Sequence, residues 1–120
     1  MDEFWGYHLI LDCSRGDKQL VSSDTVIRLF VEELVPAIGM TAHGDPIIVH
    51  FATHIPKAAG YSLVQLIETS AITGHFSDMT GDFYLDVFSC KKFNSGTVQE
   101  LVEKYFQPQT TKITFLTRQA

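Results

Sequence analysis

Three residues with reactive side chains, Ser70, His75 and Cys90, follow one another at intervals of five and fifteen residues. A serine hydroxyl is a potential nucleophile, and a histidine can move protons near neutral pH. Lys91 and Lys92 follow the cysteine directly, and two cations beside a thiol favour its thiolate form. Each residue also has a purely structural interpretation, because serines, histidines and small cysteines are common in and beside strands. The residue types alone leave both interpretations open.

The histidines and cysteines do not form a metal-binding pattern. The chain has five histidines and two cysteines, but no cysteine cluster and no His-Glu-x-x-His sequence. His50 and His54 lie four residues apart in a strand-like segment, where this spacing does not make them neighbours as it would on a helix. Cys13 and Cys90 are too few for a disulfide framework. We therefore expect no metal and no disulfide framework.

The composition indicates one globular domain, residues 1–120, without a nucleic-acid or membrane partner. The chain is 45 % hydrophobic and 19 % charged, which excludes disorder, and its length is that of an ordinary domain. Its net charge of −5 excludes the basic surface that binds nucleic acids or anionic membranes. The apolar runs are far shorter than the ~20 residues that span a bilayer. The N-terminus is acidic, unlike a signal peptide, so we expect a cytoplasmic protein.

Hydrophobic periodicity predicts the elements that must position the reactive residues. Apolar residues at helical spacing predict helices over residues 24–38 and 94–106. Apolar or alternating runs predict strands over residues 7–13, 47–54, 62–69, 71–76, 82–90 and 110–117. Ser70 falls between two of these strands. The order predicts an α+β two-layer sandwich, in which one mainly antiparallel sheet carries both helices on one face.

The sheet face without helices also has to be covered. Aromatic residues such as Phe83, Tyr84 and Phe88 are frequent in the predicted strands. Because a homodimer buries the same surface of both copies, it would cover this face without any further element. We expect a homodimer with four layers, α/β/β/α.

The spacing of Ser70, His75 and Cys90 resembles, without a gap, that of the bacterial S-adenosylmethionine decarboxylase proenzyme family. That family has a serine, a histidine five residues later and a cysteine twenty residues after the serine. Other residues of this stretch that match the family are Ile72, Thr73, Gly81, Asp86 and Phe88. Residues 6–12 resemble the family's first strand with its Gly-x-His motif, and residues 60–62 match a Gly-x-Ser motif. The order of elements fits over essentially the whole chain.

The resemblance implies that the chain cleaves itself and makes a pyruvoyl cofactor from Ser70. In the family, the serine oxygen attacks the preceding carbonyl, here that of Thr69, and forms an ester. Elimination then leaves dehydroalanine, which hydrolyses to the pyruvoyl group. The products would be a β chain of residues 1–69 and an α chain of residues 70–120.

The resemblance also implies roles for the other reactive side chains. His75 and Ser62 assist processing in such an enzyme. The pyruvoyl carbonyl forms a Schiff base with the amine of a small-molecule substrate and accepts the electrons released with CO2. Cys90 then returns a proton to the decarboxylated carbon.

Residues that hold a nucleoside in the family are missing here. Thr69 and Ala71 stand where the family has Glu and His on either side of its serine. Met79 stands in place of the glutamate that binds the ribose hydroxyls, and Pro56 in place of the aromatic residue that stacks on adenine. Retained chemistry with changed recognition residues favours a changed substrate, because specificity is differential binding of transition states.

Three functions follow from these matches and departures. We favour decarboxylation of L-ornithine or L-arginine in polyamine biosynthesis, since some members of the wider family resemble this chain in lacking the nucleoside contacts. Asp78 or Glu68 would then bind the cationic tail of the substrate. Alternatively, S-adenosylmethionine is the substrate, with Phe51, His54 or Phe76 stacking on adenine and Asp78 replacing the lost glutamate. The third function is that of an unprocessed, inactive homologue that binds or regulates a partner.

Overall fold

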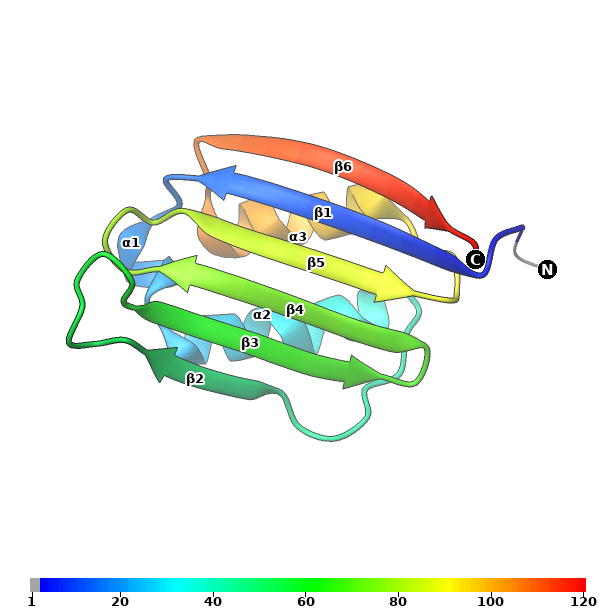
Figure 1. Cartoon of the computed structure of the whole chain (residues 1–120), viewed down its shortest axis with the longest axis horizontal. Coiled ribbons are helices and arrows are strands. Elements are labelled where there is room, and N and C mark those ends of the chain that lie inside the picture. Colours follow the sequence, from blue (N-terminus) through cyan, green and yellow to red (C-terminus); the bar gives the residue numbers. More distant parts are fainter. Residues whose placement is uncertain (1–2) are drawn as a thin grey trace.

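The computed structural model describes residues 3–120, so Met1 and Asp2 of the acidic N-terminus lie outside the described residues. The elements are β1 (Gly6–Ser14), α1 (Lys18–Val21), α2 (Asp24–Ala37), β2 (Ile47–Phe51), β3 (Gly60–Ile67), β4 (Ser70–Ser77), β5 (Phe83–Ser89), α3 (Ser95–Phe106) and β6 (Thr110–Arg118). The six strands form one sheet in the order β2-β3-β4-β5-β1-β6, and every neighbouring pair is antiparallel. The helices lie together behind this sheet (Figure 1). The expected α+β sandwich is confirmed.

The two long helices begin and end where local signals place them. The Ser23 hydroxyl accepts a hydrogen bond from the Val26 amide at 3.2 Å and caps the start of α2. Pro36 lies in the last turn of this helix, which ends one residue later, and Gly39 follows with a φ of +75°. The Asn94 side chain caps α3 in the same way as Ser23 caps α2. No helix within residues 3–120 is long and apolar enough to cross a membrane.

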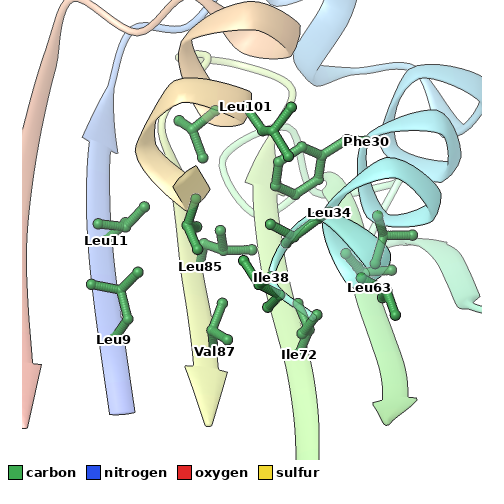
Figure 2. Close-up of a cluster of buried hydrophobic side chains, with 14 of the residues drawn as sticks. Leu9, Leu11, Phe30, Leu34, Ile38, Leu63, Ile72, Leu85, Val87 and Leu101 are labelled. Atoms are coloured by element: carbon green, nitrogen blue, oxygen red, sulfur yellow. The ribbon is translucent and has the colours of Figure 1, made fainter. Parts of the chain in front are cut away.

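The hydrophobic core lies between the helices and one face of the sheet. On α2, Phe30 and Leu34 are fully buried, and they lie on the side of the sheet that carries Ile72 and Leu85 (Figure 2). On β5 the burial alternates, so that Leu85 and Val87 belong to the core while Tyr84 and Asp86 face away from it. The predicted alternation of this strand is therefore confirmed.

The opposite face of the sheet, which we call the open face, carries no helix (Figure 1). Strand pairing and alternation place on it a set of apolar side chains that are 39–57 % exposed: Ile47, Val49, Phe51, Leu66, Tyr84 and Leu116. A set of this size, spread over the sheet, is typical of a surface that binds another protein.

Several boundaries differ from the prediction, and two of the differences lie near the candidate residues. Strand β2 ends at Phe51 rather than at residue 54, because the chain turns through a series of short loop hydrogen bonds, such as that from Ile55 N–H to the Ala52 carbonyl. The strand predicted over 62–69 ends at Ile67, which pairs with Ser70, so Glu68 and Thr69 form a two-residue hairpin turn. Ser70 is consequently the first residue of β4.

Candidate active site

The hairpin between β3 and β4 brings Ser70 beside the end of β5. Ser70 pairs with Ser89, the last residue of β5, and Cys90 follows directly. The Cys90 amide donates a hydrogen bond to the carbonyl of Thr69 at 2.9 Å. Residues 69 and 90, which are far apart in the sequence, are thus in contact across neighbouring strands. We call this group, Glu68 to Ser70 with Cys90, the cleavage end of the sheet.

The Thr69 carbonyl is the one that Ser70 would attack in self-cleavage. An N–H donor already aimed at that oxygen can stabilise the negative charge that develops on it when the carbonyl carbon is attacked. Backbone, not side chain, supplies this donor, because it is the amide of Cys90 that is bonded. The Cys90 thiol itself is half-buried at the same end. The cleavage end therefore combines the Ser70 hydroxyl, a held carbonyl and a cysteine.

The amine of Lys91 is engaged at the end of a helix. Its Nζ donates a hydrogen bond to the Gly39 carbonyl at 2.7 Å, just beyond the carboxyl end of α2. A cation in this position complements the partial negative charge of a helix C-terminus. The Lys91 amine therefore has a structural partner at the end of α2.

His75 and Ser62 form a second group near the other end of β4. They lie opposite each other on neighbouring strands, and the Ser62 hydroxyl is 3.1 Å from His75 Nδ1. The pair opens into a hollow of about 200 Å³, whose wall includes Phe51, Lys57 and Tyr84. We call this group the histidine end. A hydroxyl bonded to an exposed imidazole is suited to transfer protons near neutral pH.

The two ends of the sheet are too far apart to act together within one copy. Ser70 is the first residue of β4 and His75 is five residues later on the same strand (Figure 1). At about 3.3 Å per residue, the separation is about 16 Å. The structure brings Ser70 and Cys90 together and leaves His75 with Ser62 at a distance.

The Asp78 carboxylate forms a cluster with His50 and Tyr61 at the edge of the sheet. Its Oδ2 is 2.6 Å from His50 Nε2, and the His50 ring stacks on Tyr61 at 4.2 Å between centroids. Burial, together with the charges of Asp24 and Asp78, raises the pKa of the Tyr61 hydroxyl. Asp78 Oδ1 is buried and has no hydrogen-bond partner within residues 3–120. Asp78 does not belong to the wall of the hollow beside His75.

The remaining predicted binding residues are scattered. Glu68 is exposed in the hairpin turn, next to Thr69. His54 is exposed in the loop that joins β2 and β3. The Phe76 side chain is 2 % exposed and its ring stacks on Phe83 within the core, so it is not available to stack on a ligand. Within the part of the chain that is described, no group of three or more His, Cys, Asp or Glu residues could hold a metal ion.

Comparison with known proteins assigns the family. The sequence model of the S-adenosylmethionine decarboxylase family matches residues 7–119. The chain belongs to the S-adenosylmethionine decarboxylase family. Its fold is similar to that of an adenosylmethionine decarboxylase from Aquifex aeolicus, with a TM-score of 0.83 and 18 % sequence identity over 99 % of this chain and 94 % of that one. No curated protein matches this sequence significantly. At this identity the structural likeness shows the shared fold.

A cleft that sequence reasoning missed lies near the cleavage end of this decarboxylase-family sheet. It measures about 410 Å³ and is lined by Trp5, Phe88 and Arg118, with the last two residues of the chain. Phe88 lies opposite Ala71, the neighbour of Ser70, and its ring is 6.2 Å from that of Trp5. The Arg118 guanidinium lies 5.3 Å from the centre of the Phe88 ring. In the sequence, this cleft is indicated only by the single tryptophan, Trp5, which stands just before the Gly-x-His motif.

Proposed function

We propose that the chain is a self-processing, pyruvoyl-dependent decarboxylase that acts on L-ornithine or L-arginine and supplies polyamine biosynthesis. One observation carries the proposal: the Thr69 carbonyl is hydrogen-bonded at 2.9 Å to the amide of Cys90 directly beside Ser70. The bond that has to break therefore lies beside the backbone of residue 90, whose thiol would return a proton. Membership of the S-adenosylmethionine decarboxylase family supports the same chemistry.

Processing would begin with a shift of the Thr69 acyl group from nitrogen to oxygen. The Ser70 oxygen forms a bond to the Thr69 carbonyl carbon, the peptide C–N bond breaks, and the serine proton passes to the released amine. Elimination then removes the α-proton of residue 70 and releases the Thr69 carboxylate, and hydrolysis of the resulting dehydroalanine, with loss of ammonia, gives the pyruvoyl group. During the attack the Cys90 amide stabilises charge on the carbonyl oxygen. Once formed, the pyruvoyl group supplies a carbonyl that takes the substrate amine and accepts the electrons released with CO2.

A dimer of open faces would supply the missing proton-transfer group. His75 is about 16 Å from its own Ser70, at about 3.3 Å per strand residue. If two open faces pack together about a two-fold axis that runs across the strands, the histidine end of one copy lies over the cleavage end of the other. The exposed apolar side chains of the open face support such an interface. We therefore propose a homodimer in which each site combines both ends.

Mixed dimers test this arrangement sharply. In a dimer of one Ser70→Ala chain and one tagged His75→Ala chain, the tagged chain keeps its own serine and meets the intact histidine of its partner. Co-expression is expected to cleave the tagged chain, which stays uncleaved when expressed alone, because a proton-transfer group typically contributes about 10²–10⁴-fold. Mass spectrometry of the tagged chain measures this. No cleavage on co-expression, or a wild-type monomer at micromolar concentration in sedimentation, contradicts the shared site.

The loss of two of the family's nucleoside contacts, at Met79 and Pro56, supports an amino-acid substrate. Met79 is 46 % exposed and offers no carboxylate, and Pro56 lies in the exposed loop before β3 without a ring that could stack on a base. Glu68 is an exposed carboxylate beside Thr69, and Asp78 keeps one oxygen without a partner within residues 3–120. Either carboxylate suits the ammonium or guanidinium of the substrate.

S-adenosylmethionine is the second candidate substrate, and the cleft at Trp5 favours it. The Trp5 side chain is 61 % exposed and faces Phe88, while Phe51 is 53 % exposed beside the histidine end. Such rings can stack on adenine, which contributes about 1–3 kcal/mol per base in comparable sites.

Release of CO2 from the three substrates separates the candidates. We expect a higher kcat/KM for L-ornithine or L-arginine than for S-adenosylmethionine on fully cleaved enzyme. Glu68→Gln or Asp78→Asn is expected to raise KM for the cationic amino acid by about tenfold or more, because a charge-assisted hydrogen bond to the substrate is lost. Trp5→Ala is the control, because this substitution should change kcat/KM only for S-adenosylmethionine. A preference for S-adenosylmethionine, with a loss in Trp5→Ala, makes the second candidate correct.

A further inference from the structure

A directed chain of hydrogen bonds holds the side chain of Thr69. The Lys91 amide donates to Ser89 Oγ at 3.0 Å, and the Ser89 hydroxyl donates to Thr69 Oγ1 at 2.8 Å. The Thr69 hydroxyl then donates to the sulfur of Met40 at 3.2 Å. These residues come from three separate parts of the chain: the end of β5, the hairpin turn and the segment after α2.

The chain begins at a group that only donates and ends at one that only accepts. A backbone amide can only donate a hydrogen bond, and a thioether sulfur can only accept one. In the observed arrangement the Ser89 hydroxyl donates to Thr69 and the Thr69 hydroxyl donates to Met40, while Ser89 Oγ also lies 3.6 Å from the Met40 sulfur. Ser89 is 0 % exposed and Met40 is 7 % exposed, so little water competes for these partners. The Thr69 side chain is therefore held between two buried partners, Ser89 and Met40.

The backbone around Thr69 is held as well. Its carbonyl accepts from the Cys90 amide at 2.9 Å, and the preceding amide, that of Glu68, donates to the Thr41 carbonyl at 3.0 Å. A two-residue turn would otherwise be the most mobile part of the hairpin. Here the residue on the acyl side of the expected cleavage point is restrained by its side chain, its carbonyl and the amide before it.

We propose that Ser89 and Met40 are positioning residues for self-cleavage: through the Thr69 hydroxyl they orient the Thr69 carbonyl toward attack by Ser70. The inference rests on the proposed self-processing. Attack needs the oxygen and the carbonyl carbon aligned at near-contact distance, and small misplacements reduce such rates by about 10²-fold. Ser89 is also the strand partner of Ser70, but the side-chain hydrogen bonds of Ser89 and Met40 lead to the Thr69 hydroxyl, so we expect both residues to act through Thr69.

Variants of Thr69 give the sharpest test, because valine has the shape of threonine without its hydroxyl, whereas serine keeps the hydroxyl. Cleavage of freshly purified precursor, followed by intact mass, is expected to slow by about 10–100-fold in Thr69→Val and Ser89→Ala and to stay within a few-fold of wild type in Thr69→Ser. In Thr69→Val the Ser89 hydroxyl still has the Met40 sulfur at 3.6 Å as an acceptor, so the fold is retained.

Two further measurements separate positioning from stability. Hydroxylamine traps the ester by forming the Thr69 hydroxamate and releasing residue 70 as serine, so the trapped fraction reports the first step. It is expected to fall in Thr69→Val, while the melting temperature in an uncleavable Ser70→Ala background is unchanged. Equal cleavage rates and equal trapped ester in wild type, Thr69→Val and Ser89→Ala overturn the positioning role alone. A wild-type chain that never cleaves overturns the proposed function and the positioning role with it.

Discussion

Ser70→Ala is expected to leave the chain whole, whereas the wild type divides between Thr69 and Ser70. The alanine methyl group cannot attack the Thr69 carbonyl that the Cys90 amide holds at 2.9 Å, and without cleavage no pyruvoyl group forms. CO2 release should therefore fall to background. Intact-mass analysis should show wild-type fragments of residues 1–69 and 70–120, the second without a free N-terminal amine.

A matched serine variant controls for the loss of a hydroxyl. Ser14 lies at the end of β1 and contacts the Thr110 hydroxyl, at the end of the sheet opposite to the cleavage end. Ser14→Ala should cleave at the wild-type rate. A wild-type chain that keeps its full-length mass after long incubation, as Ser70→Ala does, would contradict self-processing and would support the unprocessed, inactive homologue.

Cys90→Ala is expected to cleave normally but to turn over about 10²–10⁴-fold more slowly, the usual contribution of a general acid. The separation of the two effects follows from the structure. The contact to Thr69 comes from the backbone amide of residue 90, which alanine retains, while the thiol is lost. Misprotonation of the product, with release of an aldehyde, is a second expected sign. Turnover per pyruvoyl group and product analysis measure both.

The other cysteine provides the control for this variant. Cys13 is buried in the core, and burial raises the pKa of its thiol to about 11. It lies at the opposite end of the sheet, where it pairs with Phe83 at the start of β5. Cys13→Ala should keep the wild-type turnover per pyruvoyl group. An unchanged rate and clean product in Cys90→Ala would remove Cys90 from the mechanism.

Local patterns in the sequence predicted most of the fold. The helix expected over residues 24–38 is Asp24–Ala37, and the one over 94–106 is Ser95–Phe106. Helical hydrogen bonds join residues four apart, so periodicity and caps define such an element from its own sequence. In the same way, the alternation of residue types along β5 predicted which side chains lie on each face of that strand. Helix α1, with four residues, is too short to show a period and was not predicted.

The sequence determined which residues are present to do chemistry, and only the tertiary structure decided which of them meet. Ser70 and His75 are close in sequence but lie on one extended strand, whose length keeps them about 16 Å apart. Ser70 and Cys90 are distant in sequence but meet because β4 and β5 pair in antiparallel register. The Trp5 cleft likewise depends on the pairing of β1 with β6. Strand pairing joins residues of any separation, so no local pattern encodes it.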